Sequence, residues 1–317
     1  MADQASMVLV LGPTGSGKSA IAIHLALEFN GEIVNCDSQQ VYRWLNIGTA
    51  KVPEADRCGV PHHLMDVADP DQAFSAGEYA RRARNILDEI RSRDRLPIVC
   101  GGTGFYVRGL LEGLMESPVR DEPLRAELNQ REQRRPGFVH RLLRRLDHAS
   151  AKRIHPNDVQ KAVRAVEVSR GAGTPMSSLF GQSEQPLRGF HWLKLGLDPS
   201  REALYARINS RCERMFQAGL IEETKALRER GYGRDTQALE SIGYRQSMDV
   251  LEGRATIDEA LADTQMQSRR YAKRQLTWFR RDPDMHWLGG FGDESQIQRD
   301  AFRLVREHLD STTGQPG

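Results

Sequence analysis

Residues 12–19 combine the residue types that hold phosphate groups in proteins. Gly12, Pro13, Thr14, Gly15, Ser16, Gly17, Lys18 and Ser19 fit the pattern G-x-x-x-x-G-K-[ST]. Glycines let successive backbone N–H groups converge on phosphate oxygens, Lys18 supplies a full positive charge, and the Ser19 hydroxyl can ligate Mg²⁺. The motif predicts a polyphosphate site. A glycine-rich turn that binds nothing is the alternative.

Two further side chains are candidates for chemistry. Asp37 follows a strand-like run at 32–36, and Thr103 follows another at 97–102. Since open α/β sheets bind ligands at the carboxyl ends of their strands, we expect both side chains at the edge that carries the phosphate motif. The alternative for Asp37 is a cap on the turn that starts at Ser38, and for Thr103 a cap on the next helix.

The motif alone does not identify the phosphate ester. Most loops of this kind serve ATP or GTP, and such enzymes usually end a buried strand with an acid that holds Mg²⁺. Here the run at 97–102 ends in Gly101 and Gly102. This weakens the ATPase interpretation without removing it, because Asp37 or Asp66 could take that role.

The hydrophobic pattern predicts the elements that position these residues. Strand-like runs at 7–11, 32–36 and 97–100 alternate with helical patterns at 18–29 and 81–93, which indicates a parallel α/β sheet. From 118 to 189 the patterns are helical only. Strand 191–197, helices at 201–218, 220–230 and 257–281, and strand 285–288 follow. We predict a P-loop NTPase-like α/β core at 1–117 and 190–311, an inserted all-helical domain at 118–189, and a disordered tail at 312–317.

Composition narrows the class of protein. In 317 residues there is no apolar run of the roughly 20 residues that span a bilayer, and the N-terminus lacks a secretory signal, so we expect a cytoplasmic protein without a membrane partner. The four cysteines have no zinc-site spacing. The net charge is only +2, but residues 121–188 hold 13 basic against 8 acidic residues, and 268–281 hold 6 basic and no acidic ones. Basic charge is therefore concentrated.

Six motifs, in this order, resemble those of the bacterial tRNA dimethylallyltransferases, and the match runs across nearly the whole chain. They are the phosphate motif at 12–19, DSQQVY at 37–42, GGTG at 101–104, DVQKAVRA at 158–165, IGYRQ at 242–246 and KRQLTWFR at 273–280. The resemblance implies transfer of a dimethylallyl group from dimethylallyl diphosphate to N6 of the adenine immediately 3′ of the anticodon, in tRNAs that read codons starting with U, with release of diphosphate.

The resemblance also implies roles for individual residues. Asp37 would bond the adenine N6 amine and act as general base, while Lys18, Thr103 and the loop amides would stabilise charge on the leaving diphosphate. Mg²⁺ would be shared between Ser19 and the phosphates, and Arg274, or its neighbour Lys273, would join the clamp. We expect a monomer, although the sequence itself does not give the oligomeric state.

By the same resemblance, the anticodon stem-loop of tRNA would be held by the insertion and by segments that line the path of the flipped base. For each basic residue the alternative is a solvated helix face. The implied contacts are Asp37, Ser38, Gln39, Gln40, Thr103, Arg125, Gln160, Lys161, Ala162, Val163, Arg164, Ile242, Gly243, Tyr244, Arg245, Gln246, Ser247, Arg274, Gln275, Leu276, Thr277, Trp278, Phe279, Arg280 and Arg281.

Three alternatives stay open from the sequence. An adenylate isopentenyltransferase would use the same donor with AMP, ADP or ATP as acceptor, but it would not need a large basic insertion. An ATP-dependent small-molecule kinase would need an adenine-stacking element near the phosphate motif, for which no clear sequence is found. An RNA-binding module with a vestigial loop would not need Lys18, Ser19, Asp37 and Thr103 together.

Overall fold

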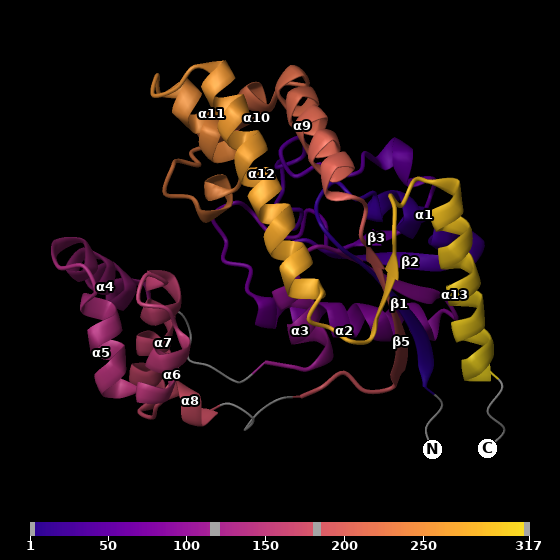
Figure 1. Ribbon diagram of the computed structural model, residues 1–317, viewed down its shortest axis with the longest axis horizontal. Coiled ribbons are helices and arrows are strands. Elements are labelled where there is room, and N and C mark those ends of the chain that lie inside the picture. The colour runs from indigo at the N-terminus through magenta and orange to yellow at the C-terminus, as the bar shows by residue number, and fades with distance from the viewer. Residues whose placement is uncertain (1–3, 115–120, 180–184, 314–317) are drawn as a thin grey trace. The chain divides into compact units, whose positions relative to one another are not determined.

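The computed structural model describes residues 4–114, 121–179 and 185–313. By its contacts the chain divides into two compact units, Met1–Leu111 with Leu187–Gly317, and Glu112–Pro186. We call them the core unit and the insertion unit (Figure 1). Within the described residues, no helix combines the length and the apolar character needed to cross a membrane.

The core unit is built on one parallel sheet of six strands in the order β3-β2-β4-β1-β5-β6. The predicted parallel α/β fold is therefore confirmed. β1 lies between β4 and β5, so the strand that leads into the phosphate motif is central. The strands are β1 Ala5–Leu11, β2 Gly31–Cys36, β3 His62–His63, β4 Leu96–Gly101, β5 Phe190–Leu197 and β6 Met285–Leu288.

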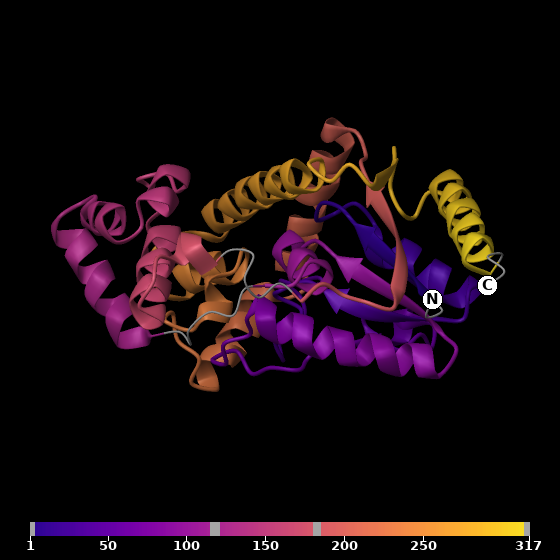
Figure 2. The ribbon, with the colours of Figure 1, turned by 90° about the horizontal axis from the view of Figure 1, so that it is seen from below.

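Helices cover both faces of this sheet because its strands are apolar on both sides. Val8 and Val10 of β1 pack in one buried cluster with α1 (Lys18–Glu28) and α13 (Ser295–Thr313). On the opposite face, α2 (Ala76–Ser92) contacts β2 and β4 and also packs on α3 (Gly104–Leu111). Figure 2 shows α2 and α13 on opposite sides of the strands.

The remaining core helices gather beyond the carboxyl ends of the strands (Figure 1). They are α9 Arg201–Gln217, α10 Leu220–Glu229, α11 Tyr244–Leu251 and α12 Ile257–Phe279, with short 3₁₀ helices at Glu54–Arg57 and Gln237–Glu240. α12 begins with a capping box between Thr256 and Glu259. This layer faces the edge at which the phosphate motif and Asp37 lie.

The insertion unit is helical throughout the residues described. It comprises α4 Glu122–Arg134, α5 Phe138–Leu146, α6 His148–Arg153, α7 Val159–Ala172 and α8 Met176–Leu179. Its own apolar cluster includes Leu128, Val139, Leu143 and Val166. Asp121, Asp147 and Asp158 cap helices of this unit, which explains the abrupt turns between short elements.

Several details differ from the sequence prediction. The insertion, predicted at 118–189, is Glu112–Pro186 by its contacts, and the helix predicted at 81–93 is Ala76–Ser92. The disordered tail was predicted to begin at residue 312, but α13 continues to Thr313, because Ile297, Ala301 and Val305 anchor this helix in the core cluster. Residues 314–317 of that prediction lie outside the described residues. Strand β3 was not predicted, since two residues are too few to show a period.

Candidate active site

The phosphate motif forms the loop between β1 and α1. Gly15 and Gly17 have φ values of 83° and 85°, which glycine alone adopts easily, and Gly17 is the N-cap of α1. The Ser16 hydroxyl and the Lys18 ammonium both donate to the Pro13 carbonyl, at 2.8 and 2.6 Å. Burial lowers the pKa of Lys18 to about 8. The ammonium is thus held in a place where an incoming anion would stabilise it.

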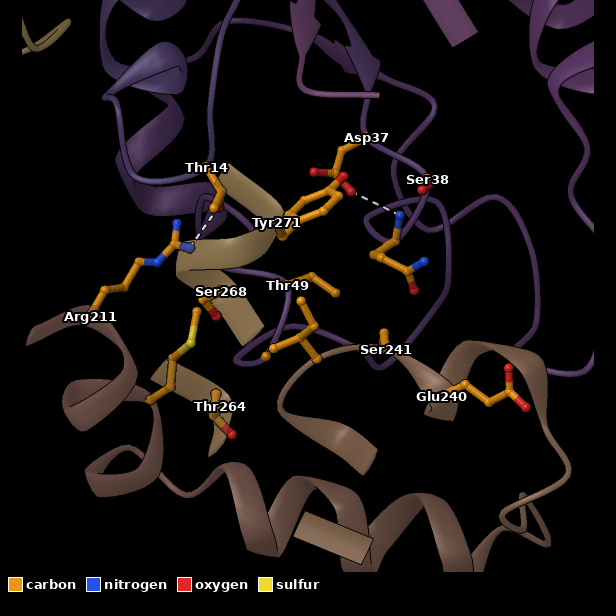
Figure 3. Close-up of a pocket in the computed structure, with 14 residues that line it drawn as sticks. Thr14, Asp37, Ser38, Thr49, Arg211, Glu240, Ser241, Thr264, Ser268 and Tyr271 are labelled. Carbon is orange, nitrogen blue, oxygen red and sulfur yellow. Dashed lines mark hydrogen bonds between the residues drawn. The ribbon is translucent and has the colours of Figure 1, made fainter. Parts of the chain in front are cut away.

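A pocket of about 300 Å³ lies beside this loop in the core unit. Figure 3 shows its polar side chains converging from several elements: Thr14 from the loop, Asp37 from the end of β2, Arg211 from α9 and Tyr271 from α12. The full lining is Thr14, Asp37, Ser38, Gln39, Gly48, Thr49, Arg211, Met215, Glu240, Ser241, Ile242, Thr264, Ser268 and Tyr271.

Asp37 combines the two roles considered from the sequence. Its Oδ1 accepts a hydrogen bond of 2.8 Å from the Gln39 backbone N–H, so the carboxylate does cap the turn. The same carboxylate lines the pocket beside Tyr271 (Figure 3). The amide oxygen of the neighbouring Gln39 is buried, and none of the described residues supplies a hydrogen bond to it. A donor group on a ligand would satisfy it.

Thr103 is directed toward Asp37 rather than toward its own helix. Its hydroxyl accepts from the Ser38 backbone N–H at 3.0 Å and is hydrogen-bonded to the Tyr271 hydroxyl. It is the backbone carbonyl of Thr103 that accepts from the first turn of α3. The side chain therefore links the β4–α3 loop to the Asp37 turn, two residues from the end of β4.

Arg211 is the main site residue that the sequence analysis missed. Its guanidinium donates to the Thr14 hydroxyl at 2.6 Å, and its Nε is buried with no hydrogen-bond partner among the described residues. Burial lowers the pKa of Arg211. A buried cation with an unused N–H next to a phosphate loop calls for an anion. The only sequence signal is its position beside the buried stripe of α9 at Leu204, Ile208, Cys212 and Met215.

The predicted segment at the end of α12 divides into buried and exposed residues. Gln275 and Phe279 are buried, so they stabilise the core rather than present a surface. Arg280 forms an ion pair with Asp198 at 2.9 Å, and the Thr277 hydroxyl donates a hydrogen bond to the Lys273 carbonyl. Leu276 is partly buried in a core cluster, whereas Arg274, Trp278 and Arg281 are exposed. Arg274 lies over the Tyr271 ring at 5.7 Å, and within the described residues no hydrogen bond joins it to the phosphate loop.

The predicted segment 242–247 is mostly structural. Tyr244 is fully buried, donates its hydroxyl proton to Glu223 at 2.5 Å and accepts from the Gly48 N–H at 3.2 Å. Gln246 and Ser247 are also buried, and Gln246 accepts from the Gly243 N–H that begins α11. Ile242 lines the pocket and Arg245 is exposed. Gln40, another predicted contact, donates to the backbone carbonyl of Thr49, a residue that lines the pocket.

In the insertion unit, two predicted arginines share one carboxylate. Glu167, with 1% of its side chain exposed, pairs with Arg125 at 2.9 Å and with Arg164 at 2.6 Å. Burial acts to raise its pKa, but hydrogen bonds from the two arginines lower the pKa of Glu167 to about 2. Gln160 and Lys161 are exposed, whereas Ala162 and Val163 are buried in the cluster of this unit.

The chemistry of the donors limits the reactions that this pocket can perform. Burial raises the pKa of Cys36 and of Cys100 to about 12, so these thiols near the site stay protonated and are poor nucleophiles. The described residues contain no cluster of three His, Cys, Asp or Glu side chains that could hold a metal. The arrangement of one hydroxyl, Ser19, at a phosphate loop suits Mg²⁺ carried in with a diphosphate.

Comparison with known proteins gives a consistent result. A family model described as IPP transferase matches residues 40–282. A tRNA dimethylallyltransferase of Koribacter versatilis is 53% identical over 307 residues, covering 96% of this chain and 99% of the relative. One from Solibacter usitatus is 51% identical over 303 residues, with the same coverage.

Solved structures resemble the whole chain as well. A tRNA isopentenylpyrophosphate transferase of Bacillus halodurans superposes with a TM-score of 0.72 at 35% identity, covering 98% of each chain. A eukaryotic dimethylallyltransferase acting on tRNA superposes with a TM-score of 0.79 at 26% identity, covering 98% of this chain and 80% of the other.

Proposed function

Because the chain belongs to the IPP transferase family, we propose that it transfers a dimethylallyl group from dimethylallyl diphosphate to N6 of the adenine immediately 3′ of the anticodon, in tRNAs that read codons starting with U. The observation that carries this proposal is the pocket itself. It brings Thr14 of the phosphate-type loop, the cationic side chain of Arg211 and a carboxylate that can orient an amine into one space of about 300 Å³.

At the donor end, the diphosphate takes the loop between β1 and α1. Lys18 exchanges its contact with the Pro13 carbonyl for phosphate oxygens, and the unused Nε of Arg211 supplies a further N–H. Ser19 would hold Mg²⁺ that arrives with the diphosphate, and the ion would supply positive charge at the leaving group. These residues stabilise the diphosphate as the bond between its oxygen and the allylic carbon breaks.

At the acceptor end, Asp37 orients the adenine amine. One oxygen stays on the Gln39 N–H and fixes the carboxylate, so the other accepts from N6. The N6 lone pair forms the new bond to the allylic carbon, the diphosphate leaves with the electrons of the C–O bond, and the N6 proton passes to Asp37. Such general-base help contributes on the order of 10²–10⁴-fold.

We also propose that the protein acts as a monomer. A base in the anticodon loop can be splayed out at small cost, and exposed cations at Lys161, Arg245, Arg274 and Arg281 provide charge for the RNA backbone. Arg125 and Arg164 keep part of their guanidinium surface exposed despite their pairing with Glu167. Since its substrate is tRNA, we place the protein in the cytoplasm.

The test offers two acceptors to the purified protein with Mg²⁺ and labelled dimethylallyl diphosphate. One is an anticodon-arm RNA with adenines after the anticodon, and the other is free AMP. Label in the RNA alone is expected. Label in AMP alone would make the protein an adenylate isopentenyltransferase. ATP turnover without label in either acceptor would mean that the phosphate loop binds a nucleotide.

A further inference from the structure

Gln275 has its whole amide committed to two loops of the site. This α12 side chain is 5% exposed. Its Oε1 accepts from the Thr14 backbone N–H at 2.8 Å, and its Nε2 donates to the Gly102 carbonyl at 2.9 Å. A backbone N–H only donates and a carbonyl only accepts, so these partners define the orientation of the amide.

These two contacts connect β1 and β4 beyond the last residue pair of their backbone pairing. β1 and β4 pair side by side up to Leu11 and Gly101, and then diverge into their loops. Gln275 bridges the loops just past this point, where no backbone pairing continues. A Cβ at Gly102 would lie 2.2 Å from the Gln275 Nε2, so the loop packs directly against this amide.

Each end of the bridge leads to a proposed reacting end of the pocket. Thr14 carries the hydroxyl that accepts from Arg211, on the diphosphate side. Gly102 precedes Thr103, whose hydroxyl holds the Ser38 N–H beside Asp37, on the amine side. Thr14 and Gly102 lie on loops that follow different strands, β1 and β4. Among the described contacts, Gln275 is the side chain that hydrogen-bonds to both loops.

From this geometry we infer that Gln275 is a positioning residue that sets the spacing between the diphosphate loop and the Thr103 loop, and hence between the allylic carbon and the adenine amine. The inference rests on the proposed function. It requires one donor and one acceptor at the end of this side chain, because the Thr14 N–H and the Gly102 carbonyl are opposite in kind. Neither a thioether nor an ionised carboxylate offers both.

The first test is the pair Gln275→Met and Gln265→Met. Gln265 lies on the same helix and also makes two side-chain hydrogen bonds, donating to the Asn209 carbonyl and the Glu213 carboxylate, but neither partner belongs to the phosphate loop or the Thr103 loop. For Gln275→Met we expect kcat to fall by about 100-fold, while KM for both substrates stays within about threefold, because a displacement of about 1 Å costs that much in rate. Gln265→Met should keep the wild-type kcat.

The second test is Gln275→Glu across pH. A protonated carboxyl donates to Gly102 and accepts from Thr14 as the amide does, whereas the ionised form cannot donate. We therefore expect the ratio of its kcat to that of the wild type to rise as pH falls from 9 to 6. Lys18, Asp37 and Arg211 interact electrostatically in this region, so dividing by the wild-type kcat at each pH removes only the part of their titration that the two enzymes share. A merely structural role would leave the ratio flat.

The outcomes separate the two proposals. If wild-type protein makes no prenylated RNA, the proposed function fails. If the wild type is active but Gln275→Met keeps its kcat, or if the Gln275→Glu ratio does not change with pH, the positioning role alone is overturned. Should Gln275→Met fail to fold, the pH ratio of Gln275→Glu still decides.

Discussion

The proposed chemistry depends on the Asp37 carboxylate, and in that proposal its two oxygens have separate tasks. Oδ1 caps the turn through Gln39, which leaves the other oxygen for an amine. Asparagine keeps an oxygen for the cap but cannot take a proton. Asp37→Asn should therefore lower kcat by at least about 100-fold with RNA affinity nearly unchanged, measured by single-turnover kinetics and by filter binding. If RNA affinity falls with the rate, Asp37 is only a structural cap.

The Lys18 ammonium predicts a pH dependence of donor binding. Its pKa is lowered to about 8, so the group is charged below pH 8 and loses its proton as the pH rises above it. Because the diphosphate needs the charged form, KM for dimethylallyl diphosphate should rise about tenfold per pH unit above 8. Kinetics between pH 7 and 9.5 at saturating RNA check this. A KM that stays constant to pH 9.5 would contradict it.

At the scale of single residues, the sequence predicts those residues whose surroundings are set by their neighbours along the chain. The phosphate motif works through neighbouring amides, so eight consecutive residues predict it, and Asp37 and Thr103 follow their strands directly. Arg211 and Tyr271 reach the pocket from helices far along the chain, and no local pattern announces them. Tyr244 shows the opposite case. It belongs to the motif at 242–246, but its hydroxyl is hydrogen-bonded to Glu223 and Gly48 in the core.

Among the elements, α12 does most to shape the site. Tyr271, Gln275 and Trp278 are spaced at i, i+4 and i+7, so they lie on one face of this helix. They contact the Thr103 hydroxyl, the Gly102 carbonyl and the backbone at Gly104 respectively. Close approach of this helix thus accounts for Gly102 and Gly104, whereas a Cβ at Gly101 would meet the Cys36 backbone of β2.

Gly104→Ala tests this packing. A Cβ at Gly104 would lie 2.2 Å from Trp278 indole atoms. The Trp278 side chain or the helix that carries it would have to shift, so we expect a loss of about 1–3 kcal/mol in the free energy of unfolding, together with a lower kcat. Gly77→Ala, in the open first turn of α2, is the matched control and should raise stability by up to about 1 kcal/mol. Equal melting temperatures for Gly104→Ala and the wild type would refute the close contact.

For the whole molecule, charge is the property that concerns RNA. The net charge of +2 hides an uneven distribution, and many basic side chains are occupied by acids, as Arg280 is by Asp198 and Arg306 by Glu28. Arg281 is exposed, and no ion pair for it is found in the part of the chain that the structure describes. We therefore expect RNA phosphates to gain the most binding free energy at the cations that remain unpaired.

Arg281→Ala should therefore weaken RNA binding in a salt-dependent way. If Arg281 contacts a phosphate, the slope of log Kd against log salt concentration should decrease by about 1. Fluorescence anisotropy between 50 and 200 mM salt measures this slope. Arg306→Ala, on α13 and paired with Glu28, is the control and should keep the wild-type slope. An unchanged slope for Arg281→Ala would remove that contact from the RNA surface.

The strand order carries a consequence for the way in which the protein is made. β5 lies directly beside β1, with Leu11 opposite Gly196, yet the 75-residue insertion unit, Glu112–Pro186, separates them along the chain. A ribosome therefore releases the first four strands before β5, the second neighbour of β1, exists, while the insertion unit has all of its own helices available. Nascent chains that end before residue 197 should keep β1 exposed at an open edge and depend on chaperones, and the pocket should form only after α12 has been synthesised.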